Sequence, residues 1–241
     1  MSGAGENCRG YIDSVYCGSG VDGKGLRCVV FYSGCNLRCP FCHNPETLYK
    51  QGTLTDVDEL IPRLLRYKPY FRRGGITLSG GEPYFRRGGI TLSGGEPFLQ
   101  KEFTLAVCAR LKAEGVHVCI ETNGYICDDA LLAAGDLIVD VKNQQEKDLS
   151  VYERLIDACL RLGAKVEFTN VLVPGVNDGA EDLAALKRLV KRYAPQTKVR
   201  FLPFRKLCEE KYTEIGLPFP YADRREGTDE DVQRAEKLVN I

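Results

Sequence analysis

The feature that most constrains the fold of this sequence is a regular alternation of short β-branched runs with longer amphipathic ones. Strand-like and helix-like segments follow one another six times, with glycines at several of the boundaries. Strands joined by crossover helices form a parallel sheet, so the pattern predicts an α/β fold. Six units of this kind predict a partial (β/α)6 barrel of the TIM type. The predicted strands span residues 27–33, 89–93, 116–121, 136–141, 165–173 and 198–204.

Capping residues and apolar spacing mark the helices between these strands. A helix is expected to begin at Thr55, with Asp58 as its capping partner and apolar residues recurring at helical spacing after it. Ser150 and Glu153 form a second predicted capping box. Further helices are expected at 101–114, from 128, at 150–162, at 180–193 and from 228, whereas the glycine-rich residues 1–25 are predicted to be irregular.

Composition argues against several classes of protein. The chain has 241 residues, enough for one substantial core, and we expect a single domain over residues 1–241. Basic and acidic side chains balance at 33 each, so nothing indicates nucleic-acid binding. Residues 1–10 are polar, and no apolar run approaches the ~20 residues of a membrane span. We therefore expect a cytosolic monomer that binds neither nucleic acid nor membranes.

Two identical stretches of fourteen residues adjoin in the sequence. Residues 70–83 and residues 84–97 both read YFRRGGITLSGGEP. Repeat architectures stack several units, so two copies do not indicate a solenoid. The fold needs one strand here, and we expect one copy to be an inserted loop. Because an insertion after the strand would obstruct the C-terminal face of the barrel, we expect the second copy to form the strand.

Polar motifs recur at the C-terminal ends of the predicted strands, where parallel barrels carry their functional groups. A cysteine-rich loop follows the first strand, SGGEP follows the second, and ETNG follows the third. Asp140 and Lys142 end the fourth strand, PGVND follows the fifth, and Arg205 follows the sixth. The sequence thus predicts a functional site at this end of the barrel.

The cysteine-rich loop contains Cys35, Cys39 and Cys42 at CxxxCxxC spacing. A structural zinc site normally takes four protein ligands, and a [4Fe–4S] electron carrier takes four cysteines. Three thiolates on a [4Fe–4S] cluster leave one iron open to bind a cofactor. On spacing alone, a zinc knuckle with a distant fourth ligand or unrelated thiols remain alternatives. The other eight cysteines are expected to be reduced, ordinary small residues: Cys8, Cys17, Cys28, Cys108, Cys119, Cys127, Cys159 and Cys208.

The cysteine spacing, with Phe41 before the third cysteine, resembles the signature of radical S-adenosylmethionine (SAM) enzymes. With the other strand-end motifs, the chain resembles a glycyl-radical-enzyme activating enzyme from about Gly10 to the last helix. The resemblance implies a barrel of the radical SAM type, a [4Fe–4S] cluster, and SAM chelated to the open iron. One electron from the cluster would cleave SAM to a 5′-deoxyadenosyl radical, which takes a hydrogen atom from a backbone glycine of a partner enzyme.

The same resemblance implies roles for individual residues. Cys35, Cys39 and Cys42 would hold the cluster, and Asp22 would lie near the substrate peptide. In the GGE motif, glycines allow the backbone to approach the methionyl amino group closely. Lys142 would meet the methionyl carboxylate. The implied cofactor-binding residues are Phe41, His43, Gly94, Gly95, Glu96, Thr122, Asn123, Asp140, Lys142 and Arg205.

Four positions depart from the family pattern. Lys24 replaces a usual proline, Glu121 a common aspartate, and Arg205 a usual histidine, while Thr169 occupies a position that is basic in similar proteins. These departures leave the identity of the protein substrate open. The interval between the cysteine loop and the second GGEP motif contains no cysteine, so the chain has no inserted ferredoxin-like module.

The expected partner is therefore a glycyl radical enzyme such as pyruvate formate-lyase, with a flavodoxin or ferredoxin as electron donor. Two alternatives compete with this interpretation. One is a radical SAM enzyme that acts on a small molecule, as in deazapurine biosynthesis. The other is a non-catalytic protein, either an iron–sulfur electron carrier or a zinc-stabilised binding module.

Overall fold

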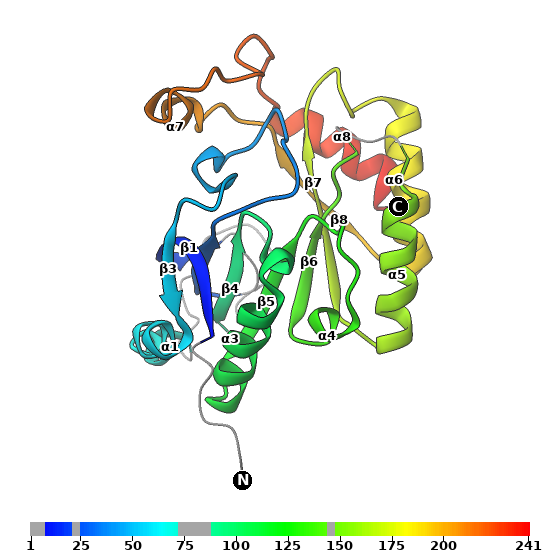
Figure 1. Cartoon of the computed structure of the whole chain (residues 1–241). Helices are drawn as coiled ribbons and strands as arrows, with labels where there is room; N and C mark the ends of the chain where they lie inside the picture. The colour runs from blue at the N-terminus through cyan, green and yellow to red at the C-terminus, as the bar shows by residue number, and fades with distance from the viewer. Residues whose placement is uncertain (1–7, 21–24, 72–87, 144–147) are drawn as a thin grey trace. The chain divides into compact units, whose positions relative to one another are not determined.

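The structure is a computed structural model that describes residues 8–20, 25–71, 88–143 and 148–241 (Figure 1). Its contacts divide the chain into two compact units. Unit 1 comprises residues 1–36, 47–121 and 133–136, and unit 2 comprises residues 37–46, 122–132 and 137–241. Each unit contains parallel strands that alternate with helices along the chain.

The strands of unit 1 are ordered β3-β1-β2-β4-β5. Strands β2, β4 and β5 run parallel, as predicted, while β1 pairs antiparallel with both β2 and β3. The prediction of an irregular segment over residues 1–25 was wrong, because β1 occupies residues 9–19 of it. The strand was missed since its buried residues are interrupted by exposed ones and form no apolar run. The bounds are β1 Arg9–Ser19, β2 Arg27–Tyr32, β3 Thr53–Asp56, β4 Gly89–Gly94 and β5 His117–Thr122.

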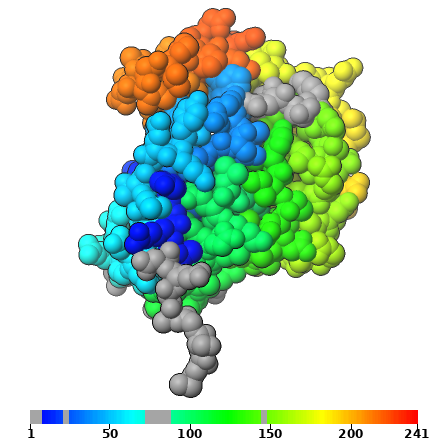
Figure 2. All heavy atoms as spheres, viewed as in Figure 1, coloured from blue at the N-terminus to red at the C-terminus, as the bar shows by residue number. Residues whose placement is uncertain are grey.

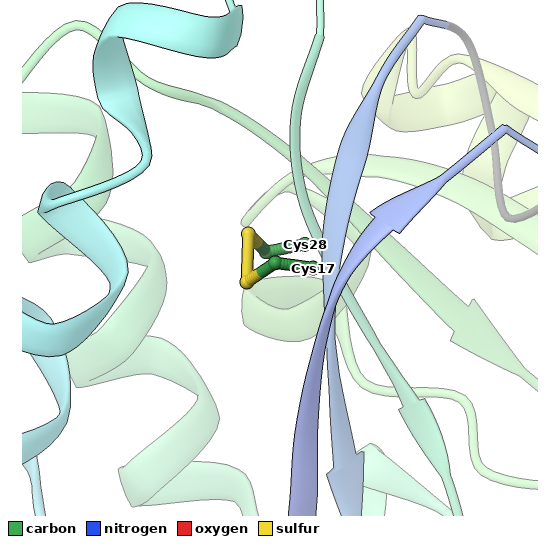
Figure 3. Close-up of a disulfide and its surroundings, with 2 residues drawn as sticks. All are labelled: Cys17 and Cys28. Atoms are coloured by element: carbon green, nitrogen blue, oxygen red, sulfur yellow. A yellow bond between two sulfur atoms is a disulfide. The ribbon is translucent and has the colours of Figure 1, made fainter.

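A disulfide joins β1 to β2 (Figure 3). Cys17 and Cys28 are opposed in the antiparallel register, with their Cα atoms 4.0 Å apart. The prediction that both thiols are reduced was therefore wrong. Composition could not reveal the bond, because it depends on a strand pairing that the sequence pattern did not show.

The helices of unit 1 are α1 (Val57–Leu65), α2 (Lys68–Phe71) and α3 (Lys101–Ala113), with the 3-10 turn η2 (Pro97–Gln100) before α3. The predicted cap at Thr55 was wrong. Thr55 belongs to β3, and the side chain of Asp56 accepts the hydrogen bond from the Asp58 N–H at 2.9 Å. An aspartate directly before the helix caps it as well as threonine would.

The duplicated stretch supplies β4 from its second copy. The first copy begins in α2, and residues 72–83 lie outside the described part of the chain. The Gly88 N–H donates to the Phe71 carbonyl at 3.1 Å. The described chain therefore stops at Phe71 and resumes at Gly88 next to it.

Unit 2 contains the parallel strands β6, β7 and β8, as predicted. Helix α5 packs against α6, α6 packs against α8, and α8 packs against β8 (Figure 1). Among the described helices of unit 2, α7 has no counterpart among the predicted ones, and it stands at the surface of this unit (Figure 2). The strands are β6 Asp136–Asp140, β7 Val166–Leu172 and β8 Val199–Pro203; the helices are α4 Asp129–Leu132, α5 Ser150–Leu162, α6 Ala180–Tyr193, α7 Glu209–Glu214 and α8 Asp229–Val239.

Helix ends in unit 2 correct one prediction and confirm another. The predicted capping box at Ser150 was wrong, because Leu149 is the N-cap and makes no side-chain bond. The Asp148 carboxylate accepts from the Ser150 N–H instead, at 2.9 Å. The helix predicted from residue 228 is confirmed as α8, which Thr228 caps in a capping box with Asp231.

The C-terminal end of α8 covers part of β8. The side chain of Asn240 accepts from the Val199 N–H at 2.8 Å and donates to the Val199 carbonyl at 3.0 Å. An amide side chain thus takes the position that a neighbouring strand would occupy. Among the described residues, no helix has the length and apolar character needed to cross a membrane.

Candidate functional site

The cysteine loop connects β2 to the 3-10 turn η1 (Pro45–Thr47). The Cys35 N–H donates to the Leu48 carbonyl at 3.2 Å in unit 1, and the Cys42 N–H donates to the Cys39 carbonyl at 3.0 Å in unit 2. All three cysteines of the loop lie outside disulfide bonds and are half-buried. Within the described ranges, no three His, Cys, Asp or Glu side chains are grouped as a metal site. By donor type the three thiols suit an iron–sulfur cluster, which thiolates hold.

The GGE motif begins at Gly94, the last residue of β4 in unit 1, and continues the pairing of β4 with the end of β2. The Gly95 N–H donates to the Tyr32 carbonyl and the Glu96 N–H donates to the Gly34 carbonyl, both at 2.8 Å. A Cβ on Gly95 would lie only 2.2 Å from the Gly34 oxygen, and Gly94 has a φ of +93°. Both glycines are thus required by the close approach of two backbone segments.

The Glu96 side chain is fully buried. It caps the turn η2 by accepting from the Phe98 N–H at 3.0 Å. Beside it, the Ser93 hydroxyl donates to the Glu121 carboxylate at 2.6 Å, which links the ends of β4 and β5. These contacts fix the backbone of the GGE motif in one conformation.

Thr122 and Asn123 are buried in unit 2, at the end of β5. The Gly124 N–H donates to the Thr122 hydroxyl, and the Tyr125 N–H donates to the Asn123 side-chain oxygen, both at 3.1 Å. Both side chains therefore shape the turn that follows the strand.

Asp140 and Lys142 form an ion pair at the end of β6. The distance between Nζ and Oδ2 is 2.5 Å, and the two side chains are only 15% and 10% exposed for Lys142 and Asp140. The Lys142 ammonium also lies 5.3 Å from the centre of the Phe41 ring, within the range of a cation–π contact. The Lys142 N–H donates to the Tyr152 hydroxyl at 2.7 Å. This arrangement joins the end of β6 to the cysteine loop within unit 2.

His43 and Arg205 meet through the backbone. The His43 Nε2 atom lies 2.8 Å from the Arg205 carbonyl oxygen, so Nε2 carries the hydrogen. Burial lowers the pKa of His43, and the carbonyl partly opposes that shift. The guanidinium of Arg205 donates to the Gly227 carbonyl at 2.8 Å. The backbone of Arg205, and not its charge, therefore supports the cysteine loop.

Several contributors to this site were not predicted from the sequence. Lys211 of α7 donates to Asn44 at 3.0 Å and to Glu46 at 2.5 Å, which anchors the loop just after the cysteines. An aromatic cluster surrounds Phe41, and its rings come from segments distant in the sequence: Phe204, Tyr212, Phe219 and Tyr221. The two aromatic residues on either side of Pro220, Phe219 and Tyr221, were the only signal in the sequence.

The PGVND motif after β7 has a structural role. Asn177 is fully buried, and its side-chain oxygen accepts from the Val173 N–H at 2.8 Å. Its amide nitrogen donates to Asn143 at 2.9 Å and to Asn170 at 3.1 Å. The three asparagines hold the loops that follow β6 and β7 in place.

The predicted site residues thus gather in two groups. In unit 1, Gly94, Gly95 and Glu96 pair with residues 32–34, immediately before Cys35. In unit 2, contacts connect Phe41 with Asp140 and Lys142, and His43 with Arg205. Thr122 and Asn123 lie in unit 2 in a turn of their own, and Asp22 lies outside the described residues.

Comparison with protein families gives a match to a 4Fe-4S single cluster domain over residues 21–88 and residues 85–157. The two matches overlap at residues 85–88, inside the second copy of the duplicated stretch. Together they cover more than half of the chain and include the cysteine loop, the GGE motif and the end of β6.

Solved structures share the fold. A radical SAM methyltransferase from Sphaerobacter thermophilus is 22% identical, with a TM-score of 0.56 over 88% of this chain and 63% of that one. SuiB of Streptococcus suis, in a complex with its precursor peptide SuiA, gives a TM-score of 0.54 at 13% identity over 74% of this chain and 39% of that one. The predicted α/β fold of the radical SAM type is confirmed.

Relatives in sequence extend over almost the whole chain. The pyruvate formate-lyase-activating enzyme of Clostridium pasteurianum is 34% identical over 95% of this chain and 97% of its own. That of Staphylococcus epidermidis is 34% identical over 97% of this chain and 96% of its own. With the family match, these relatives support the two predicted cofactors, a [4Fe–4S] cluster and SAM. The chain belongs to the pyruvate formate-lyase-activating enzymes, a family of radical SAM enzymes.

Proposed function

We propose that this protein activates a glycyl radical enzyme, and that the partner is a pyruvate formate-lyase. The cluster and SAM would supply the one-electron chemistry that removes a hydrogen atom from a backbone glycine of the partner. The observation that carries the proposal is the contact of Lys142 with both Asp140 and Phe41. Through Lys142, the ion pair at the end of β6 contacts the loop that carries the cysteines. Charged side chains next to the cluster ligands are what a charged cofactor bound beside a cluster needs.

In this proposal Cys35, Cys39 and Cys42 hold the cluster. Their thiols form no disulfide and are partly exposed, which suits metal binding, because a ligand must lose its proton and be reached by the metal. Burial raises the pKa of Cys108 to about 12 and that of Cys159 to about 11, which favours the protonated thiol at both. Exposure and thiol pKa therefore favour Cys35, Cys39 and Cys42 over Cys108 and Cys159 as cluster ligands.

Charged and polar side chains of unit 2 would orient SAM. Lys142 offers an ammonium to the methionyl carboxylate, and Phe41 offers a ring face beside the cluster. His43, neutral at pH 7 because burial lowers its pKa, adds no charge next to the sulfonium. Asp140, Thr122, Asn123 and the backbone of Arg205 complete the proposed cofactor contacts.

The GGE motif would meet the methionyl amino group through its carbonyl oxygens. An amino group donates hydrogen bonds, so it needs acceptors. The N–H groups of Gly95 and Glu96 already donate to the carbonyls of Tyr32 and Gly34. This pairing leaves the peptide oxygens of the motif as the groups suited to bind a cationic donor.

We further propose that Asp22 contacts the partner's glycine segment and that a flavodoxin or ferredoxin supplies the electron. The protein would act as a cytosolic monomer without nucleic acid or membrane as a partner. Balanced charge, at 33 basic and 33 acidic side chains, supports the absence of a nucleic-acid substrate.

Electron paramagnetic resonance tests the proposal. The anaerobically reconstituted protein is mixed with a pyruvate formate-lyase, SAM and dithionite, and the lyase is expected to gain a glycyl radical signal. SAM cleavage without that signal would instead favour a small-molecule substrate. No SAM cleavage at all would favour an electron carrier or zinc module and end the proposal.

A further inference from the structure

Strands β6 and β7 place Asp140 and Thr169 directly opposite each other. The two residues are register partners in a parallel ladder, so their side chains leave the same face of the strands. Counted over the whole residue, Thr169 is 1% exposed and Asp140 is 7% exposed. This face of unit 2 therefore holds a buried carboxylate next to a buried hydroxyl.

Each side chain keeps one polar atom without a hydrogen-bond partner among the described residues. These atoms are Oδ1 of Asp140 and Oγ1 of Thr169. The other oxygen of Asp140 accepts from Lys142. An unsatisfied buried polar atom is costly, and roughly nine in ten such groups have a partner in native proteins. Two of them on neighbouring strands indicate a ligand that satisfies both.

Neighbours of the Asp140 and Thr169 pair contact Phe41 of the cysteine loop. Val171 follows Thr169 by two residues, hence on the same face, and packs against the cluster that contains Phe41. Lys142, which pairs with Asp140, also contacts the Phe41 ring. Two separate lines of contact thus connect Phe41 with the Asp140 and Thr169 pair.

The charges near Asp140 and Thr169 favour an uncharged ligand group at this pair. Lys142 lies 2.5 Å from the Asp140 carboxylate, and Arg200 is the register partner of Thr169 on β8, where it pairs with Glu167 at 3.1 Å. An added cation would meet two positive side chains, and an added anion would meet the free oxygen of Asp140. A hydroxyl carries no charge, donates to the carboxylate, and can accept from Thr169.

Geometry favours two adjacent hydroxyls over a peptide group. The N–H and C=O of one trans peptide point in opposite directions, so one peptide cannot serve both atoms from the same side. A cis diol presents two hydroxyls on one side. Neighbouring strands lie about 4.8 Å apart, a spacing that two adjacent hydroxyls can bridge by one hydrogen bond each.

We propose that Thr169 binds the ribose diol of SAM, together with the free oxygen of Asp140. The inference rests on the proposed function, from which it takes the cofactor. It adds a cofactor-binding residue on β7, a strand that contributed none to the predicted set. It also gives the neutral side chain at this position a role that a basic residue would not fill in the same way.

The test measures SAM binding by anaerobic titration calorimetry on the cluster-loaded protein without reductant, so that no turnover occurs. The variants are T169V, which removes the hydroxyl at nearly constant shape, and T169S, which keeps it. T169V is expected to bind SAM roughly five- to tenfold more weakly, the value of about one hydrogen bond. T169S is expected to bind within twofold of wild type.

Deoxygenated cofactors identify the group that Thr169 meets. SAM analogues that lack the 2′- or the 3′-hydroxyl are titrated into wild type and T169V. One of the two should bind wild type more weakly, and for that analogue T169V should cause no further loss. Because the analogues are also measured on wild type, the test survives a T169V protein that does not fold.

T104V is the matched control. The Thr104 hydroxyl is fully buried too, but it donates to the Pro97 carbonyl at 2.8 Å. T104V should lower the melting temperature and leave SAM affinity unchanged, whereas T169V should not lower the melting temperature of the SAM-free protein. Equal SAM affinity in T169V and wild type would overturn the inference while leaving the proposed function intact. So would equal binding of both deoxy analogues and SAM to wild type. If wild type bound no SAM, the proposed function would fail first.

Discussion

Lys142 and Asp140 form a largely buried ion pair, with 2.5 Å between Nζ and Oδ2. Each partner lowers the cost of burying the other, so removal of one leaves an uncompensated charge. K142M is therefore expected to lower the free energy of unfolding by about 3 kcal/mol and to weaken SAM binding. Denaturant unfolding and calorimetry measure the two effects.

The double variant D140N/K142M separates the two effects. With both charges removed, stability should return most of the way to wild type, because no buried charge remains unpaired. SAM affinity should stay low, because the Lys142 ammonium and the Asp140 carboxylate that are proposed to contact SAM are both missing. Recovery of SAM binding in the double variant would contradict the role proposed for Lys142.

Iron content separates the cysteines. C35A, C39A and C42A should each lose the cluster or SAM cleavage, since three thiolates hold the cluster and the fourth iron takes SAM. C108A and C159A are the controls, because burial raises the pKa of both thiols and both lie in the core. Iron and sulfide analysis after anaerobic reconstitution makes the comparison; a loss in either control as large as in the triad would refute the open-iron assignment.

The duplication offers two glutamates in the same local sequence, Glu96 and Glu82. Glu96 caps η2 from a fully buried position, so E96A should cost about 1 kcal/mol of stability and weaken SAM binding. Glu82 lies outside the described residues, and E82A is expected to change neither. Equal losses in the two variants would show that the first copy forms the site.

Deletion of residues 72–85 gives a second view of the duplication. It removes fourteen residues and joins Phe71 to Arg86, which restores a single copy of the repeated sequence. Since Phe71 and Gly88 are hydrogen-bonded to each other, the shortened connection has little distance to span. The deletion variant is expected to fold with an unchanged or higher melting temperature.

Reduction should destabilise unit 1. The Cys17–Cys28 disulfide closes a separation of 11 residues, which corresponds to about 2–3 kcal/mol of chain entropy in the unfolded state. The melting temperature of wild type should fall when a thiol reductant is added, and that of C17S should not respond. Alkylation followed by mass spectrometry gives the direct check: free thiols at both positions before reduction would disprove the bond.

Acid should weaken the start of α8. The Arg225 guanidinium and the Thr228 N–H hold the pKa of Asp231 well below its usual range. Because the pKa is lower in the folded state, the carboxylate stabilises the protein above about pH 4 and loses this contribution as the pH falls further. D231N should cost about 1 kcal/mol at pH 7, with a smaller difference from wild type near pH 3. D223N, at an exposed position, is the control and should match wild type at both pH values.

The parallel strands were predictable because each is a compact apolar run bounded by turn residues. The residues that cap the helix starts were less predictable from the sequence. At both failed caps an aspartate stood one or two residues from the predicted residue, at Asp56 and at Asp148, and bonded the first free N–H groups. Several side chains near a helix start can satisfy the same donors, and the sequence does not rank them.

The site was predicted as motifs but not as contacts. The GGE glycines were expected to make room for a ligand, whereas Gly95 makes room for the Gly34 carbonyl. Lys211 and the rings around Phe41 were missed altogether, because only tertiary packing brings residues more than 160 positions apart together. Spacing in a sequence identifies site residues that lie together in one loop. It does not identify site residues that come from a helix distant in the sequence.

Asn240 has a further consequence for how these molecules behave toward one another. The backbone groups of Val199 that it engages belong to β8, and unpaired strand edges are where separate chains join into fibres. By occupying these backbone groups, the side-chain amide of Asn240 therefore opposes self-association through the edge of β8. Removing Asn240 and Ile241 would cost little in buried area, yet it would expose the Val199 backbone groups at the edge of β8 to other chains.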